Sequence, residues 1–323
     1  MPDKAYIGGV VVSNQISGSA RRIFELCSLL YQKKYKVTIF TYDGVPPEWI
    51  KVNVPLRPFD YLDFEYPDVL ICPDYENYYL ISSYDTKLKI VFLHNATFLK
   101  KYLKIAEEPK TLVFTMNPQM VQFFRKDRVI FYPFGINTNI FSPSNQNLEN
   151  VTKNILFILP SDIKYIYDYI SFISSIYEEI KNINVTFSIL AKNLSKQITN
   201  IYFHIHNNIP TTTLVNLYRN IYLAVDLRRK LEWNNCALEL LAVGKPVVCF
   251  PDGANLFIED FHNGIFLKHY DSYFIAGIIS LLVNDKYFYN HIKKNGFQVI
   301  KNHAYEIGVE RIEKVFNSYG IIE

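Results

Sequence analysis

The chain has 323 residues, which suits two domains of ordinary size, and 49% of them are hydrophobic, so each domain has a core to bury. Its net charge of +3 is too small to favour nucleic acid as a partner, but it leaves room for anionic ligands and loose contact with an acidic membrane surface. The 4 cysteines form no C-x-x-C pair and no zinc spacing. We therefore expect buried free thiols, no metal and a reducing, cytoplasmic setting.

The first 41 residues predict a βαβ unit, with strands at 6–13 and 36–41 and a helix at 20–33. The loop at 14–19 falls where open α/β sheets bind ligands. It lacks the G-x-G-x-x-G pattern, so NAD is disfavoured. Gly18 serves either the turn itself or a ligand, and both interpretations stay open.

Further strands are expected at 68–72, 89–93, 111–115 and 129–132, with a helix at 118–125. His94 follows one of these strands, on the ligand side of a parallel sheet, although a lone histidine more often caps a loop. The segment FLKKYLKI, residues 98–105, predicts a basic amphipathic helix. Such a helix is usually a solvated face and less often touches a membrane or an acidic acceptor.

A second α/β domain is expected after the polar segment 144–153. Its strands are predicted at 154–159, 185–190, 201–205 and 222–225. Helices are predicted at 165–180, 211–219, 271–283, 286–297 and 303–319. The alternation of strands and helices again predicts a parallel sheet.

Residues 231–252, LEWNNCALELLAVGKPVVCFPD, contain the most informative pattern. Asn234 and Asn235 predict the start of a short apolar helix over 236–243. Gly244 ends that helix, Pro246 prevents its restart, and 247–250 is a buried strand. The free N–H groups of such a helix start favour a phosphate. Glu239, one turn inside, suits a ribose diol, but a core helix with one solvated glutamate fits equally well.

The same stretch resembles the E-G-F-G-L-P-L-L-E-A-M-A-C-G-x-P-V-V signature of retaining GT-B glycosyltransferases of family 4. Gly244 and Pro246 anchor the match, so the second glutamate of the family falls on Glu239 and the first on Leu231, with Glu232 one position away. Residues 134–143, FGINTNIFSP, resemble the family's N-G-V-D-T-x-x-F-x-P, and the loop around Gly18 resembles its G-G-A-E.

The resemblance implies an α/β GT-B fold, in which two Rossmann-like domains with parallel sheets face each other across a cleft. It implies an acceptor-side domain at 1–148, a nucleotide-sugar-binding domain at 149–303, and a helix at 304–323 that returns toward the first domain. The implied activity is transfer of a hexose from a nucleotide-sugar with retention and without a cofactor. No D-x-D triplet is present, so a metal-bound diphosphate is not expected. The acceptor is left open between a glycan, a lipid and a protein.

The resemblance also implies site residues. The implied catalytic residues are His94 and Lys164; the implied donor-binding residues are Gly18, Asn234, Asn235, Cys236 and Glu239; further candidates are Ser17, Ser19, Arg228, Arg229 and Glu232.

The chain departs from the family pattern at three places: Leu231, the pair Pro160-Ser161 in place of Gly-Arg, and Phe257 in place of a glutamate. Two alternatives therefore stay open. One is an inactive module that binds a nucleotide-sugar or a partner protein, and the other is an epimerase acting on a nucleotide-sugar. The trio 228–230 either compensates for the missing arginine or is a solvated loop.

Overall fold

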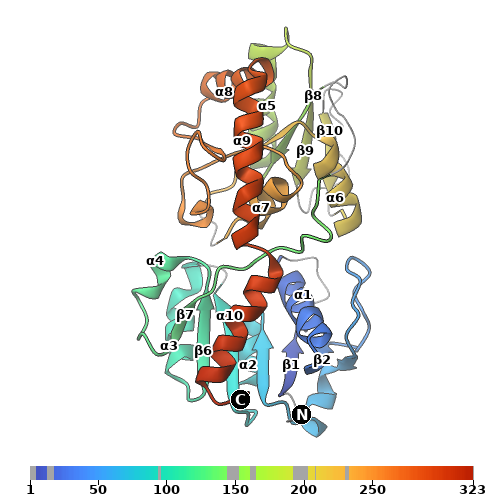
Figure 1. Cartoon of the computed structure of the whole chain (residues 1–323), viewed down its shortest axis with the longest axis vertical. Helices are drawn as coiled ribbons and strands as arrows, with labels where there is room; N and C mark the ends of the chain where they lie inside the picture. Colours follow the sequence, from blue (N-terminus) through green and yellow to red (C-terminus); the bar gives the residue numbers. More distant parts are fainter. Residues whose placement is uncertain are drawn as a thin grey trace. The chain divides into compact units, whose positions relative to one another are not determined.

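The computed structural model describes residues 5–12, 18–93, 96–143, 153–160, 165–191, 203–207, 209–229 and 233–322. The chain divides into two compact units, and both are drawn in Figure 1. Unit 1 comprises Met1–Asn137 and His303–Glu323, and unit 2 comprises Thr138–Asn302. Among the described residues, no helix has both the length and the apolar character needed to cross a membrane.

Unit 1 is built on a seven-stranded sheet in which every pairing is parallel. Its strands, in spatial order, are β3 (Leu56–Pro58), β2 (Lys36–Thr41), β1 (Tyr6–Val10), β4 (Val69–Cys72), β5 (Leu88–Leu93), β6 (Thr111–Thr115) and β7 (Val129–Phe131). Every residue of the central strands β1, β4 and β5 is buried, as expected for a parallel sheet that helices cover on both faces. The strand order reverses between β1 and β4.

The helices of unit 1 are α1 (Gly18–Gln32), α2 (Tyr75–Ile81), α3 (Leu99–Glu107), α4 (Pro118–Val121) and α10 (Tyr305–Ser318). Two short 3₁₀ turns, Phe59–Phe64 and Ala96–Phe98, complete it. The sequence did not predict α2, whose cap is Asp74: its side chain accepts from the Asn77 N–H. The helix predicted over 118–125 is wrong in length, because α4 ends at Val121 and a turn follows.

The glycine of the FGINTNIFSP motif lets the chain approach α10 closely. A Cβ on Gly135 would lie 2.5 Å from the Ala304 carbonyl oxygen, which no side chain tolerates. Ile136 forms a parallel bridge with Ala304, and the Tyr132 hydroxyl donates to the Gly308 carbonyl at 2.7 Å. The motif thus joins the end of the first strand series to the C-terminal helix within unit 1.

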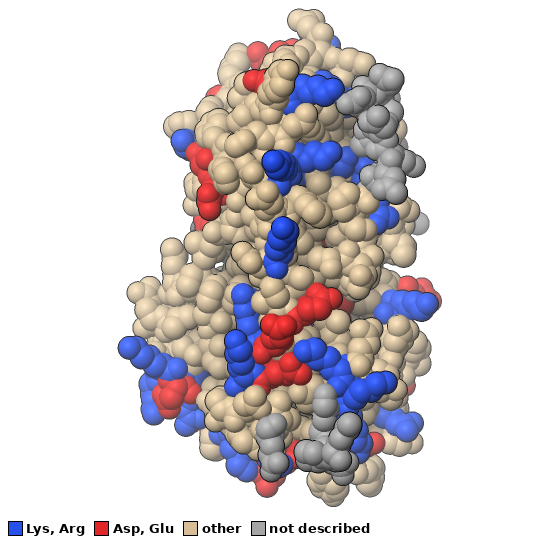
Figure 2. All heavy atoms as spheres, viewed as in Figure 1, with Lys and Arg blue, Asp and Glu red and all other residues tan. Residues whose placement is uncertain are grey.

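Charges of both signs are interspersed on unit 1 over α10 and its neighbours, as Figure 2 shows for one face. An ion pair between Lys33 Nζ and Glu313 Oε2, at 2.8 Å, links the end of α1 to α10. On this face, therefore, acidic groups offset the basic ones instead of leaving one extended basic field.

Unit 2 has a six-stranded parallel sheet. Its strands, in spatial order, are β10 (Phe203–Asn207), β9 (Val185–Ala191), β8 (Lys153–Ile158), β11 (Leu223–Asp226), β12 (Val247–Cys249) and β13 (Ile265–Phe266). Its helices are α5 (Ile166–Ile180), α6 (Thr211–Asn220), α7 (Asn235–Ala242), α8 (Ser272–Asn284) and α9 (Lys286–Val299). The strand order reverses between β8 and β11, the point where open sheets bind ligands at the carboxyl ends of their strands.

Helix α7 lies within one residue of the bounds that its sequence predicts. Asn234 is the N-cap, and Gly244 adopts a φ of +76°, which a residue with a Cβ rarely takes. The helix packs against α9 through Gly296, where a Cβ would lie 2.6 Å from a methyl of Leu241. These contacts pack the C-terminal end of α7 against α9.

Candidate functional site

The candidate site lies in unit 2, at the carboxyl edge where the strand order reverses. Strand β11 ends in Asp226, and the chain passes through Arg228 and Arg229 before it enters α7. The loop that follows β12 lies beside this start, because the Asn234 N–H donates to the Ala254 carbonyl at 3.2 Å. The site is therefore formed by the ends of two neighbouring strands and the first turn of one helix.

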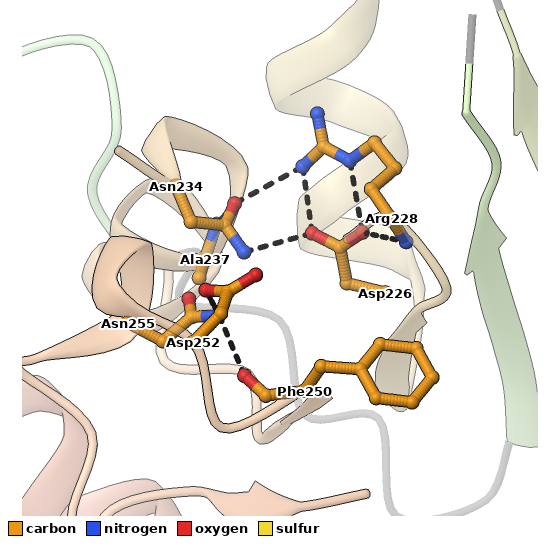
Figure 3. A network of polar contacts seen from close by, with 7 residues as sticks. All are labelled: Asp226, Arg228, Asn234, Ala237, Phe250, Asp252 and Asn255. Carbon is orange, nitrogen blue, oxygen red and sulfur yellow. Dashed lines mark hydrogen bonds and ion pairs between the residues drawn. The ribbon is translucent and has the colours of Figure 1, made fainter. Parts of the chain in front are cut away.

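A buried polar network fixes this edge, as Figure 3 shows. Arg228 donates from Nε to Asp226 Oδ1 at 2.8 Å and from Nη2 to Asp226 Oδ2 at 2.6 Å. Arg228 Nη2 also donates to Asn234 Oδ1 at 3.0 Å, and Asn234 Nδ2 donates to Asp226 Oδ2 at 2.9 Å. Burial alone would lower the pKa of Arg228, but the Asp226 carboxylate outweighs it and raises that pKa well above its ordinary value. The pair is therefore a permanent ion pair, with little net charge left for a ligand.

The same network orients the start of α7. Asn234 Oδ1 accepts from the Ala237 N–H at 3.1 Å, which satisfies one of the unpaired donors of the helix. The N–H groups of Asn235 and Cys236 donate to no acceptor among the residues that the structure describes. Both residues are partly exposed. Two N–H groups at the positive end of a helix thus face outward, the arrangement that binds phosphate oxygens.

The loop after β12 lies beside the start of α7 and is held by its own hydrogen bonds. Asn255 Nδ2 donates to the Phe250 carbonyl at 2.9 Å and to Asp252 Oδ1 at 3.1 Å (Figure 3). Phe257, which stands where the family has a glutamate, is instead a buried ring 5.3 Å from Trp233. Phe257 therefore contributes packing rather than a carboxylate to this loop.

Glu239 lies one turn below the exposed N–H groups and is only 1% exposed, so the solvated glutamate considered from the sequence is wrong. The fully buried hydroxyl of Tyr218, on α6, lies in its electrostatic neighbourhood together with the Cys236 thiol. Burial, followed by Cys236 and Glu239, raises the pKa of Tyr218, so this hydroxyl stays protonated. Glu239 therefore places a buried acceptor one turn inside the start of the helix.

Arg229 differs from Arg228 in its exposure and in its contacts. It is exposed, and its guanidinium carbon lies 4.0 Å over the ring of Phe250 and 5.4 Å from that of Tyr270. Tyr270 in turn stacks on Phe172 of α5 with ring centroids 4.3 Å apart. The stack orders the Arg229 guanidinium while leaving it in solvent, because rings bind a cation through their faces. Among the described residues, no carboxylate pairs with it.

The structure describes Arg228 and Arg229 of the trio 228–230 and corrects one expectation for the cysteines. Arg228 is not a solvated loop residue, because it forms an ion pair with Asp226, two residues earlier. Arg229 is exposed and stacks on two rings. Cys236 is partly exposed, unlike Cys27, Cys72 and Cys249, so the expectation of four buried thiols is wrong.

Several predicted site residues lie elsewhere. Gly18 and Ser19 form the first turn of α1 in unit 1, and both are partly exposed. The following predicted residues lie outside the described residues: Ser17, His94, Lys164 and Glu232. The sequence reasoning missed Asp226, Tyr218 and Tyr270. A signal existed only for Asp226, as the acidic residue that ends an apolar strand.

Neither a scan against protein-family models nor a search of curated proteins finds a match to this sequence. Solved structures do match over nearly the whole chain. Sucrose-phosphate synthase from Thermosynechococcus elongatus matches with a TM-score of 0.74 and 14% identity over 98% of this chain and 99% of that one. HepE of Anabaena, solved in complex with UDP-glucose, has a TM-score of 0.73 and 14% identity over 97% of this chain and 100% of that one.

WaaG, a glycosyltransferase involved in lipopolysaccharide biosynthesis, has a TM-score of 0.70 and 11% identity over 96% of this chain and 99% of that one. At these identities the likeness establishes the fold, which is GT-B: two Rossmann-like units, each with a parallel sheet.

Proposed function

We propose that this protein is a retaining, metal-independent glycosyltransferase that takes a hexose from a nucleoside diphosphate sugar. The observation that carries the proposal is the start of α7, where two outward N–H groups lie one turn above the buried carboxylate of Glu239. The N–H groups can donate hydrogen bonds to a diphosphate. The carboxylate, one turn further in, can accept hydrogen bonds from the diol of the attached ribose. The GT-B structures similar to this chain, among them one bound to UDP-glucose, support the same proposal.

In this proposal the start of α7 stabilises the leaving diphosphate. Asn235 and Cys236 donate through their backbone, and Lys164 and Arg229 supply positive charge. Arg228 positions the helix start through Asp226 and Asn234 without binding the donor itself. Negative charge that grows on the diphosphate as the sugar departs is then met by groups already in place, which lowers the barrier to transfer.

Unit 1 is the proposed acceptor side. His94 would lie by the donor sugar, and Gly18, Ser17 and Ser19 would approach the donor phosphate or the acceptor, as the resemblance implies. The acceptor's class stays open among glycan, lipid and protein. A cytoplasmic location, peripheral to a membrane, is part of the proposal.

A second candidate is a GT-B module that binds a nucleotide-sugar without turning it over. Leu231, at the position of the first family glutamate, favours it, as does the neutralisation of Arg228 by Asp226. Slow release of free sugar from the donor separates the two, because glycosyltransferases commonly hydrolyse their donors and a binding module does not.

A panel of nucleotide-sugars tested by thermal shift examines the proposal directly. A donor at about 100 times its dissociation constant stabilises the fold by about 2.7 kcal/mol through mass action. We expect one base and sugar combination to raise the melting temperature more than the free sugar does. If every member of the panel leaves the melting temperature unchanged, the proposed donor site is refuted.

Glu239→Gln is expected to weaken nucleotide binding by about 1–3 kcal/mol, or about 5- to 150-fold in dissociation constant, because an amide replaces one charged acceptor of the ribose hydroxyls. Isothermal titration with the nucleoside diphosphate measures it. Glu178→Gln, on the solvated side of α5, is the matched control and should bind normally. Unchanged affinity in a folded Glu239→Gln protein would remove Glu239 from the site.

Donor turnover is expected to continue in the presence of a chelator, because helix N–H groups and side-chain cations replace the metal at the diphosphate. Sugar release is measured with EDTA, and again after addition of manganese or magnesium. Activity that disappears with EDTA and returns with either metal would contradict metal independence.

Lys164→Ala and Arg229→Ala should each reduce the binding of a nucleoside diphosphate more than that of the nucleoside, since only the former carries the charge. The losses should shrink as salt rises, because an open edge is screened. Lys181→Ala, at the far end of α5, is the control. Equal losses for both ligands would exclude either residue as a diphosphate ligand.

A further inference from the structure

Two histidines from separate segments of unit 2 meet on its surface. His262 lies in the turn that precedes β13, and His291 lies in the second turn of α9. Their ring centroids are 5.5 Å apart, the ring planes are inclined at 75°, and both residues are exposed. Two imidazoles that bind one ion at Zn–N distances of about 2.0–2.1 Å have their centroids about 5–6 Å apart. The spacing of this pair therefore suits a shared metal ion.

The amide of Asn295, one helical turn after His291, lies between the two rings. Its Nδ2 is 3.4 Å from His262 Nδ1 and 3.2 Å from the His262 carbonyl oxygen. The same atom is 3.1 Å from Nε2 and 3.5 Å from Nδ1 of His291, and an exposed ring can turn either nitrogen toward it. A neutral imidazole has one acceptor nitrogen, so three acceptors share the two hydrogens of this amide. Acceptors therefore exceed donors at this point, which favours a cation.

The turn that presents His262 is held in a strained form. Phe261 adopts a φ of +59°, which bulky residues rarely take. Its ring lies 6.1 Å from that of Phe288 on α9, centroid to centroid. Helix α9 also approaches the turn at Gly296, where a Cβ would lie 3.0 Å from the Asn263 carbonyl oxygen. Packing against α9 thus fixes the position from which the His262 imidazole reaches the helix.

We propose that His262 and His291 bind one Zn²⁺ ion, with the Asn295 amide oxygen turned toward it as a third ligand. Imidazole nitrogen suits zinc, and water can complete the four positions. Among the described residues, no group of three or more His, Cys, Asp or Glu side chains could hold a metal, so this ion has only two such ligands and exchanges readily. It would fasten α9 to the loop that runs from β12 to β13, and it takes no part in the proposed transfer.

Isothermal titration of Zn²⁺ into the full chain, freed of metal with EDTA and then of EDTA by dialysis, tests the proposal without any donor. His262→Gln and His291→Gln should each weaken Zn²⁺ binding at least about tenfold, because even groups that only support a metal ligand commonly contribute that much. The matched control is His204→Gln with His206→Gln. These histidines are two residues apart on one face of the edge strand β10, and the variant should bind Zn²⁺ as the natural chain does.

The third ligand has a test of its own. Asn295→Asp replaces the amide oxygen with a carboxylate, a stronger ligand for Zn²⁺, and should tighten binding about tenfold. Asn290→Asp adds the same charge at an exposed position about 140° around α9 from Asn295 and should change binding little.

The proposal is overturned if Zn²⁺ binding survives both single histidine variants or disappears in the β10 variant. It is also overturned if Asn295→Asp binds Zn²⁺ no more tightly than Asn290→Asp does. None of these measurements involves a nucleotide-sugar, so a failure here leaves the donor site proposed at the start of α7 untouched.

Discussion

Asp226→Ala is expected to lower the free energy of unfolding by about 3–5 kcal/mol, the usual result of removing one partner from a buried ion pair. Asp226 is 1% exposed and accepts two side-chain bonds from Arg228 and one from Asn234. Without it, a largely buried guanidinium and an amide lose their acceptors together. Urea denaturation followed by circular dichroism measures the loss in unit 2.

The chain contains its own control for this variant. Arg125 and Asp127 have the same two-residue spacing as this pair, with Nη2 and Oδ2 3.1 Å apart, but their side chains are 62% and 60% exposed. Asp127→Ala should cost no more than about 1 kcal/mol. The double variant Asp226→Leu with Arg228→Met should recover part of the loss, because it leaves no buried charge unpaired. If Asp226→Ala costs as little as Asp127→Ala, the network does not hold this edge together.

Lys245→Met is expected to raise the free energy of unfolding by about 3 kcal/mol at about pH 7. Burial, helped by the nearby charge of Lys293, lowers the pKa of Lys245 from 10.5 to about 8. The lysine is only 8% exposed, and methionine matches its unbranched shape without the charge. Keeping Lys245 protonated therefore costs free energy in the native state, whereas it costs none in the unfolded chain.

Because the pKa of Lys245 is lowered in the native state, the stabilisation by Lys245→Met depends on pH. Below about pH 8 both states keep the proton and the penalty is complete. Between that pH and 10.5 the native lysine is neutral while the unfolded one is still charged, so the stability of the natural chain rises with pH. The gain from Lys245→Met should thus fall below about 1 kcal/mol near pH 10. Lys294→Met, an exposed control on α9, should change little at either pH. A gain that does not depend on pH would show that the charge is not its cause.

The start of α7 could be read from the sequence because its signals are local. An asparagine cap, a glycine with positive φ and the proline behind it each act within a few residues, and the structure confirms all three. The GT-B fold followed from the alternation of strands and helices together with motifs that keep their order along the chain. The structures with this fold are only 11–14% identical to this chain, so the fold can form with few residues in common.

The chemistry around that helix could not be read in the same way. Asp226 and Arg228 are close in sequence, but which side chain points inward depends on where β11 ends, and the sequence does not show that. The Arg229 stack depends on Phe250 and Tyr270, which the fold brings from other segments. Helix α2 was missed because its seven residues are too few to show a helical period.

The most direct test of the proposed transfer is proton NMR of the sugar released from a nucleotide-sugar in the presence of EDTA, with UDP-glucose as the first donor. We predict that free sugar forms and that its first-formed anomer has the α configuration of the donor bond. First appearance of the β anomer would contradict retention. Tight donor binding with no release of sugar would leave this chain as a binding module and contradict the proposed transferase.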